Sequence, residues 1–397
     1  MLPTPQYVSS FLTTRTKTNS HQTYPLQKKY QSAEYLRTLP HLRARLPANA
    51  LLLRLRSHAI AHLTTFFAER EFTQTHPPIL TSSDCEGAGE VFGITTASEG
   101  DAPLSSTDPS RDEGQAPAAA GPFFRTPKYL TVSSQLHLEA LAQAVGGVWT
   151  LSPTFRAERS DTARHLSEFY MLEAEATFVS ELDAVMDLAE DMIRFVTKGL
   201  RGSAVGREVL HGKQREGEEG LDLQARWEGI IAGPWPRITY TEAIDILIAS
   251  NEVFEHSPTW GAGLQAEHER YLAREVGKGG PVFVTKYPTD IKPFYMLPSA
   301  AENERQTVEC FDLLLPDVCE VAGGSMREHR LEPLQAAMRE RAIGEEGMEW
   351  YLDLRRWGTV PHGGFGVGFD RLLSYLGGVG NIREIVAFPR WVGRCEC

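Results

Sequence analysis

Residues 155–175 read FRAERSDTARHLSEFYMLEAE, two strand-like arms that carry a high density of charge. Side chains alternate across a strand, so Arg156 and Glu158 share one face of the first arm. The same alternation groups four residues on one face of the second arm: Phe169, Met171, Glu173 and Glu175. The polar residues 159–164 between the arms read as a loop. This stretch therefore predicts an antiparallel hairpin with a charged face.

A charged hairpin face has two explanations. Cross-strand ion pairs in contact with water would satisfy it, and this is the usual case for an arbitrary charged hairpin. Alternatively, the face binds an anionic, planar ligand, because buried arginine and glutamate side chains are costly unless a partner pairs with them. The residues of the hairpin alone leave both explanations open.

The length and composition of the chain are those of a globular protein. Its 397 residues are enough for two domains, or for one large domain with insertions. No apolar run approaches the roughly 20 residues that span a bilayer, so we expect no membrane association. A net charge of −12 argues against a surface coated with nucleic-acid-binding charge, although it leaves room for a local basic patch.

The cysteines and the N-terminal residues bear on cellular location. The five cysteines show no paired CxxC spacing, so we expect reduced thiols in an intracellular protein, with neither a zinc site nor a disulfide framework. Residues 1–33 lack Asp and Glu and are rich in Ser and Thr. This composition fits a mitochondrial presequence or a disordered terminus. We expect a mitochondrial rather than a cytoplasmic location.

Several segments between these features predict regular or irregular structure. Apolar residues at helical spacing predict a long amphipathic helix from Leu51 to Glu71. Ser180 and Asp183 predict a capping box that opens a further helix. The charged, glycine-rich residues 201–222 read as a loop. Residues 97–122 are rich in Ala, Ser, Gly, Pro and Asp, which predicts a disordered insertion.

A second charged site lies in VECFDLLLPDVCEVAGGSMRE, residues 308–328. Asp312 and Glu320 face each other across a Pro-Asp turn in this segment. Two carboxylates beside bound phosphate suit Mg²⁺, which prefers oxygen ligands and completes its shell with water and phosphate. A hairpin with solvated acidic side chains is the alternative.

A glycine pattern follows in GGFGVGFDRLLSYL, residues 363–376. Alternation places Gly364, Gly366 and Gly368 on one strand face, which is then bare backbone against which a flat ring can lie. Arg371 follows at the start of a helix, whose N-terminus favours anions. Close packing of a helix on a glycine strand is the alternative.

These segments together resemble the class II aminoacyl-tRNA synthetases. Residues 155–175 look like motif 2 of that class, and GGFGVGFDR looks like motif 3. THPPIL looks like the end of motif 1, and Pro78 stands at the position of the characteristic proline of that motif. The arm RHLSEFYMLEAE is most similar to the asparaginyl-tRNA synthetases. The resemblance covers about residues 24–390 and implies an α+β fold, a catalytic domain with an antiparallel sheet flanked by helices.

The resemblance also implies a domain organisation. Residues 24–50 resemble the linker that follows an anticodon-binding OB-fold in asparaginyl-tRNA synthetases, and too few residues precede them for a five-stranded barrel. We therefore expect a targeting or disordered segment over 1–23, a linker remnant of the missing anticodon-binding domain over 24–50, and the catalytic domain over 51–397. The region Leu51–Leu80 would form a homodimer interface.

The resemblance assigns roles to individual residues. Arg156 and Arg371 would be catalytic, with Arg156 on the α-phosphate of ATP and Phe169 stacked on adenine opposite Arg371. Asp312 and Glu320 would bind Mg²⁺. The full expected ATP site comprises Arg156, Glu158, Arg164, His165, Phe169, Asp312, Glu320, Gly368 and Arg371. The expected amino-acid site comprises Glu86, Ser133, Gln135, Glu173 and Arg327.

Side-chain chemistry favours asparagine over aspartate as the amino acid. Arg327 can donate to a side-chain carbonyl of either, whereas Glu173 accepts from an amide NH₂ and repels a second carboxylate. Aspartyl members of the class place a lysine where this chain has Leu138. We therefore expect formation of asparaginyl-adenylate and its transfer to the acceptor end of tRNA(Asn). Ser134 replaces a glycine of the family, and a positive φ angle at that position would strain the serine backbone.

Two alternatives remain open. The first is an asparagine-synthetase-like paralogue that adenylates aspartate, against which Leu138 and Glu173 count. The second is a noncatalytic class II-like regulatory or interaction protein. Five intact residues count against this second alternative, since a protein without catalysis has no chemical need for them: Arg156, Glu158, Asp312, Glu320 and Arg371.

Overall fold

The computed structural model describes residues 24–27, 29–82, 90–95, 123–212, 221–300 and 305–397. Three expectations concern other residues and lie outside this description. They are the N-terminal segment 1–23, the loop residue Glu86 and the insertion 97–122.

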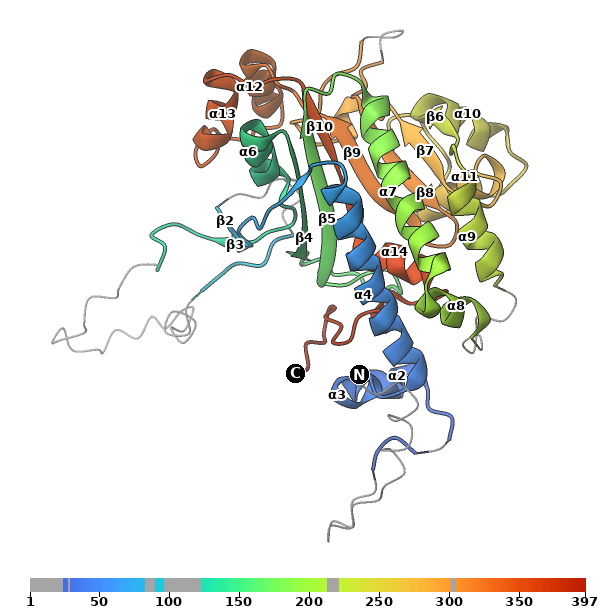
Figure 1. Cartoon of the computed structure of the whole chain (residues 1–397). Helices are drawn as coiled ribbons and strands as arrows, with labels where there is room; N and C mark the ends of the chain where they lie inside the picture. The colour runs from blue at the N-terminus through green and yellow to red at the C-terminus, as the bar shows by residue number, and fades with distance from the viewer. Residues whose placement is uncertain (1–23, 28, 83–89, 96–122, 213–220, 301–304) are drawn as a thin grey trace, which may run out of the picture.

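An eight-stranded sheet forms the centre of the protein, with the strand order β1-β4-β5-β10-β9-β8-β7-β6 (Figure 1). The strands are β1 (Thr73–Gln74), β4 (Gly147–Phe155), β5 (Glu168–Thr177), β6 (Arg237–Thr239), β7 (Val282–Thr285), β8 (Cys310–Leu315), β9 (Cys319–Met326) and β10 (His362–Gly368). All pairings from β4 to β7 are antiparallel, whereas β1 and β6 pair in parallel with β4 and β7 at the two edges. The predicted antiparallel sheet is confirmed for its central strands, and each edge adds a parallel pair. A separate small sheet pairs β2 (Leu80–Thr81) with β3 (Tyr129–Leu130).

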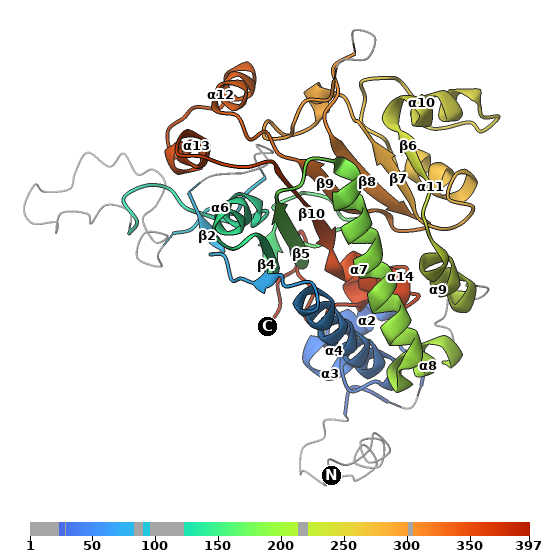
Figure 2. The ribbon, with the colours of Figure 1, turned by 45° about the horizontal axis from the view of Figure 1, so that its top comes forward.

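Helices flank this sheet, which confirms the predicted α+β architecture. The two longest, α4 (Pro47–Ala68) and α7 (Leu182–Gly202), lie side by side across one face (Figures 1 and 2). The other helices are α2 (Ala33–Arg37), α3 (Pro40–Arg43), α6 (Gln135–Val145), α8 (Ala204–His211), α9 (Leu223–Ala232), α10 (Tyr240–Ala249), α11 (Ala266–Glu275), α12 (Leu331–Glu340), α13 (Glu349–Arg356) and α14 (Phe369–Leu376), with short 3₁₀ turns η1 (Thr289–Ile291) and η2 (Ile382–Glu384).

The largest hydrophobic core lies between the sheet and the helix pair α4 and α7. Phe67 of α4 stacks on Trp149 of β4, with ring centroids 4.7 Å apart and planes inclined by 12°. Ile193 of α7 and Leu172 of β5 are buried in the same cluster. Burial of each such side chain contributes about 1.5–3 kcal/mol. One face of the central strands is therefore used for packing, and the opposite face is left for a site.

Three local predictions were wrong in their boundaries or type. The first long helix begins at Pro47 rather than Leu51, because proline suits the first helical turn. The N-cap of α7 is Glu181 without a side-chain cap bond, so the capping box of Ser180 and Asp183 does not form. Residues 201–222 contain α8, which Ser203 caps by accepting from the backbone N–H of Gly206.

The segment 24–50 packs against the C-terminal part of the chain. Arg43 of α3 is 2% exposed, and its guanidinium donates to the carbonyl oxygens of Arg383 (2.8 Å) and Val386. The same guanidinium pairs with Glu384 at 3.3 Å. A buried arginine with these partners anchors the segment to the domain that follows.

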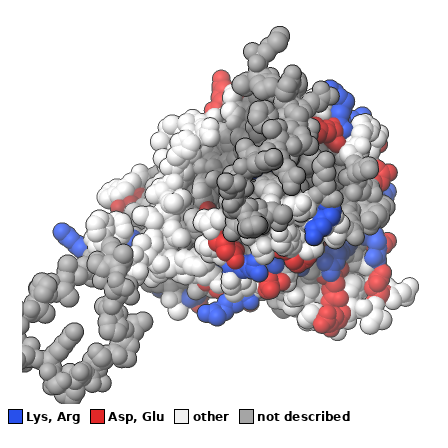
Figure 3. Space-filling view, turned by 90° about the horizontal axis from the view of Figure 1, so that it is seen from below, with Lys and Arg blue, Asp and Glu red and all other residues white. Residues whose placement is uncertain are grey.

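The surface charge, the helices and the cysteines of the described residues can be compared with the sequence. In the view from below, the described residues that are visible carry basic and acidic side chains that are interspersed (Figure 3). Among the helices of the described ranges, none is long and apolar enough to cross a membrane. Cys310, Cys319, Cys395 and Cys397 are free thiols, and Cys85 lies outside the described residues.

Candidate active site

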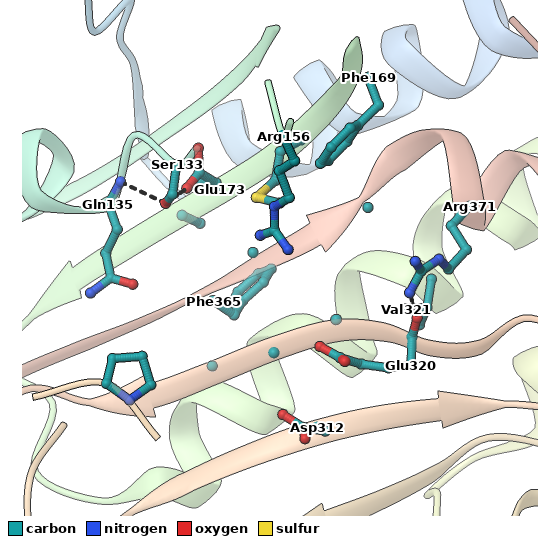
Figure 4. Close-up of a pocket in the computed structure, with 18 of the residues that line it drawn as sticks. Ser133, Gln135, Arg156, Phe169, Glu173, Asp312, Glu320, Val321, Phe365 and Arg371 are labelled. Carbon is teal, nitrogen blue, oxygen red and sulfur yellow. Dashed lines mark hydrogen bonds between the residues drawn. The ribbon is translucent and has the colours of Figure 1, made fainter. Parts of the chain in front are cut away.

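A cavity of about 510 Å³ opens on the sheet face opposite α4 and α7 (Figure 4). Alternation along β5 explains its place, because Leu172 points into the core while Met171 and Glu173 line the cavity. Apart from Glu86, which lies outside the described residues, every predicted site residue lines this cavity: Ser133, Gln135, Arg156, Glu158, Arg164, His165, Phe169, Glu173, Asp312, Glu320, Arg327, Gly368 and Arg371. Segments far apart in sequence therefore meet in one concave site.

The predicted hairpin forms from β4 and β5, paired from Gly147 opposite Ala176 to Phe155 opposite Glu168. Arg156 and Glu158 lie just beyond the end of β4, not within the strand as predicted. The Arg156 guanidinium lies 5.8 Å from the ring centroid of Phe169 and 3.8 Å from a Glu158 oxygen. The hairpin therefore places a cation beside an aromatic ring at the cavity wall.

The loop between β4 and β5 is closed by local hydrogen bonds. His165 Nδ1 lies 3.0 Å from the Ser160 hydroxyl and 2.6 Å from the Thr162 hydroxyl, while its Nε2 lies 3.4 Å from Glu158. Arg164 Nη1 lies 2.9 Å from Cys319 Sγ. Burial is the main effect that lowers the pKa of His165. The loop thus directs Arg164 toward Cys319 of β9 and holds His165 beside Glu158 at the cavity.

A bare glycine surface forms the cavity floor, but its members differ from the prediction. A β-carbon at Gly364 would collide with the carboxylate of Glu175 and the carbonyl oxygen of Ala174, so this position is already filled. Gly366 pairs with Gly323 of β9, and both line the cavity. The floor is therefore made by Gly366, Gly368 and Gly323, and the contribution of β9 was missed because it requires knowledge of the strand register.

Asp312 and Glu320 face the same side of the sheet, as predicted. A β-carbon at Gly323 would lie 3.5 Å from an oxygen of each carboxylate. A register shift between Leu313 and Leu314 produces this arrangement, since without it Glu320 would point to the opposite face. Burial, reinforced by the charge of Asp312, raises the pKa of Glu320.

Two further charged residues contact Asp312 and Glu320, and the sequence analysis did not identify them. Lys292 Nζ lies 2.7 and 2.8 Å from the two oxygens of Asp312. Glu269 of α11 accepts from the Glu320 backbone N–H at 3.2 Å. Burial and the charges of Glu320 and Asp312 raise the pKa of Glu269 to about 7. No spacing pattern linked these residues to the site, because each comes from a separate segment.

The acidic cluster has the donor chemistry of a magnesium site that needs further oxygen ligands. Buried carboxylate oxygens on one face suit a hard divalent cation. Among the residues that the structure describes, no group of three or more His, Cys, Asp or Glu side chains is arranged to hold a metal. Asp312 and Glu320 therefore fit Mg²⁺ only together with phosphate or water oxygens.

The other end of the cavity holds the described residues that we predicted to bind the amino-acid substrate. Glu173 accepts from the Ser133 hydroxyl and from the Ser134 backbone N–H, the latter at 2.9 Å. Burial raises the pKa of Glu173. Ser134 has a φ angle of −89°, so the replacement of glycine causes no backbone strain there. Leu138 is 1% exposed and lines the cavity without supplying a cation.

Arg327 is held by Glu175, a partner that the sequence did not indicate. Its Nε and Nη2 donate to the two carboxylate oxygens at 3.2 and 2.9 Å, and its Nη1 donates to the Ser325 hydroxyl at 2.6 Å. Burial raises the pKa of Glu175, and the Arg327 guanidinium opposes that rise. A bidentate pair of this kind fixes the plane of the guanidinium.

Figure 4 shows the resulting division of the cavity. Ser133, Gln135 and Glu173 lie at one end, and Asp312, Glu320 and Arg371 lie at the other. Arg156 projects between the two groups from the hairpin side. Arg371, in the first turn of α14, donates to the carbonyl oxygen of Glu320.

Comparison with known proteins identifies the family. The family model for tRNA synthetases class II (D, K and N) matches residues 32–392. The asparagine–tRNA ligase of Oleidesulfovibrio alaskensis is 46% identical over 369 residues, 93% of this chain and 76% of that protein. The mitochondrial asparagine–tRNA ligase of Saccharomyces cerevisiae is 43% identical over 383 residues, 93% of this chain and 74% of that protein.

A solved structure supports the same family assignment. The asparaginyl-tRNA synthetase of Pyrococcus horikoshii, complexed with asparaginyl-adenylate, superimposes with a TM-score of 0.76 at 31% identity. That match covers 92% of this chain and 74% of the other. The sequence motifs, the cavity and these relatives agree, and the chain therefore belongs to the class II tRNA synthetases of the D, K and N group.

Proposed function

We propose that this protein activates asparagine with ATP to form asparaginyl-adenylate and transfers asparagine to tRNA(Asn). The observation that carries this proposal is the placement of Glu173, Arg327 and Leu138 in one cavity with Arg156. Relatives 43–46% identical are asparagine–tRNA ligases, which supports the same reaction.

The cavity supports a reaction by positioning and charge stabilisation. Asparagine lies with its side chain between Glu173 and Arg327, and its carboxylate attacks the α-phosphorus of ATP. The bond to pyrophosphate breaks as the new bond forms, and Arg156 and Arg371 stabilise the charge that develops on the phosphate oxygens. A ribose hydroxyl of the tRNA end then attacks the carbonyl carbon, and AMP leaves. No protein nucleophile is required.

The remaining ATP contacts follow from the two ends of the cavity. Phe169 stacks on the adenine ring, with Arg371 on the opposite side, while Glu158, Arg164 and His165 hold the nucleotide from the β4–β5 loop. Gly368 leaves room for the ring. Asp312 and Glu320 would hold Mg²⁺, which would neutralise phosphate charge.

Amino-acid selection follows from charge at the other end. Glu173 accepts from the amide of asparagine and repels the carboxylate of aspartate. Ser133 orients Glu173, and Gln135 closes the same end. Glu86 completes this set by pairing with the substrate ammonium group. The absence of a cation at Leu138 weakens the case for the aspartate-adenylating paralogue.

Assembly and location follow from the family resemblance. The Leu51–Leu80 region exposes the apolar side chains of Leu53, Ile79 and Leu80 at 38–41% of their surface, which supports a homodimer interface there. Residues 51–397 form the catalytic domain, residues 24–50 are a segment that resembles the linker of asparaginyl-tRNA synthetases, and residues 1–23 target the protein to mitochondria. A mitochondrial relative in yeast supports that location, while other relatives are bacterial.

Amino-acid-dependent ATP–pyrophosphate exchange tests the proposal without tRNA. We expect exchange with asparagine and little with aspartate. Arg156→Ala should reduce it about 10²–10³-fold, as expected for loss of a charge-stabilising group. The Arg156 side chain is 30% exposed, so its removal should leave the fold intact.

The outcomes separate the alternatives. Exchange with aspartate alone would support the asparagine-synthetase-like paralogue. If the folded protein shows no exchange with either amino acid, the enzymatic function is wrong. Charging of a tRNA(Asn) transcript with radiolabelled asparagine then tests the second step.

A further inference from the structure

A buried carboxylate lies directly behind the amino-acid end of the cavity. Glu139 of α6 is 0% exposed and does not line the cavity. Its two oxygens accept hydrogen bonds from four side chains: Gln135 Nε2 at 3.1 Å, Tyr351 Oη at 2.8 Å, Arg355 Nη2 at 2.7 Å and His362 Nε2 at 3.1 Å. These donors come from α6, α13 and β10, so Glu139 joins three elements.

One of these donors belongs to the cavity itself. Gln135 is the first residue of α6 and lines the amino-acid end, while its side-chain amide is held by Glu139 one helical turn later. The carboxylate therefore fixes the orientation of the Gln135 amide. Loss of this acceptor would free a side chain that we expect to contact asparagine.

Two other residues that donate to Glu139, His362 and Arg355, also hold the backbone around Arg327. The backbone N–H of Arg327 donates to the carbonyl oxygen of His362 at 3.0 Å. Arg355 Nε donates to the carbonyl oxygen of Glu328, the next residue, at 3.0 Å. The residues that bind the Glu139 carboxylate thus also hold the main chain that carries Arg327.

Glu139 also sets the charge behind the amino acid. His362 Nδ1 lies 2.8 Å from the Val360 carbonyl oxygen and its Nε2 faces Glu139, so each ring nitrogen faces an acceptor. Arg355 is a buried cation that pairs with the same carboxylate at 2.7 Å. Burial disfavours the ionised form of Glu139, but Arg355 and His362 outweigh it and hold the pKa of Glu139 below its usual range.

We propose that Glu139 is a positioning residue that sets the preference for asparagine over aspartate. It holds Gln135 and Arg327 in place, and its negative charge prevents Arg355 from attracting an anionic side chain. This inference rests on the proposed function. The competing explanation is that the network only stabilises the fold.

Glu139→Gln tests the inference, because it keeps the shape of the side chain and removes its charge. In pyrophosphate exchange we expect the KM for asparagine to rise at least about tenfold, as for loss of a charged hydrogen bond. The KM for ATP should stay at the wild-type value. The ratio of asparagine to aspartate activity should fall, because the pocket gains a net positive charge.

Glu190→Gln provides a matched control. Glu190 of α7 is 4% exposed, pairs with Arg194 at 3.3 Å and accepts from the Trp235 backbone N–H, but it does not line the cavity. We expect this variant to change the unfolding midpoint without changing either KM. A purely structural role of Glu139 would give the same result as this control.

Tyr351→Phe decides the question if Glu139→Gln fails to fold. It removes one donor to Glu139 and keeps the aromatic ring, so a smaller rise in the KM for asparagine alone is expected. Unchanged asparagine kinetics and unchanged amino-acid preference in the folded variants would overturn the inference. A wild-type protein without asparagine-dependent exchange would instead overturn the proposed function on which the inference depends.

Discussion

The glycine floor predicts opposite outcomes for one substitution at two positions of β10. A methyl group at Gly366 would lie 3.3 Å from Met171 Sδ and 3.7 Å from Glu173 Cγ. A flexible methionine can relieve the first contact, so Gly366→Ala should destabilise the fold by less than about 1 kcal/mol. The methyl group would, however, occupy the surface against which we expect the adenine ring to lie. An added methylene in a filled site costs about 1–3 kcal/mol, which corresponds to a roughly five- to 150-fold higher KM for ATP.

Gly364→Ala should give the reverse pattern. Its methyl group would collide with the carboxylate of Glu175 and the backbone carbonyl of Ala174. Relief requires either breaking the pair between Glu175 and Arg327 or shifting β5 away from β10, so we expect a loss near or above the upper end of about 1–3 kcal/mol in unfolding free energy.

Both variants are compared by thermal unfolding and by pyrophosphate exchange at saturating asparagine. An unchanged KM for ATP in Gly366→Ala would refute the placement of the ring on the floor. Wild-type stability in Gly364→Ala would refute the close approach of β5 to β10. A loss of stability in Gly366→Ala as large as that in Gly364→Ala would contradict the distinction between the two positions.

Three further predictions concern charge, metal and assembly. The pKa of Glu269 is raised from 4.5 to about 7, so its ionisation disfavours the folded state progressively as the pH rises through that window. Glu269→Gln should therefore raise the free energy of unfolding by up to about 3 kcal/mol more at pH 8 than at pH 4. Denaturant unfolding without metal measures this difference, and an equal stabilisation at both pH values would contradict the raised pKa of Glu269. Removal of Mg²⁺ with EDTA should abolish pyrophosphate exchange, and added Mg²⁺ should restore it. Asp312→Asn should raise the Mg²⁺ concentration that half-maximal exchange requires. An unchanged Mg²⁺ requirement in this variant would exclude Asp312 as a ligand. Leu80→Asp should shift a dimer to a monomer in sedimentation equilibrium, whereas a wild-type protein that is already monomeric would refute the interface.

The features predicted well from the sequence are those encoded in local periodicity. Alternation alone placed Phe169, Met171 and Glu173 on the cavity face of β5, because successive side chains of a strand point to opposite faces wherever the strand lies. The long helix predicted from Leu51 was found for the same local reason, although it begins at Pro47. The family resemblance then grouped motifs that are distant in sequence, which periodicity cannot do.

Other features required the tertiary structure, because they depend on which segments become neighbours. The register shift after Leu313 turns Glu320 toward Asp312, and strand register places Gly323 beside Gly366 on the floor. The partners of Arg327 and Asp312, Glu175 and Lys292, come from other segments of the chain. The sequence by itself determined the motifs, the faces of the strands and the family, whereas packing and register alone decided the ion pairs and the shape of the cavity, since these arise from contacts between residues that no local pattern connects.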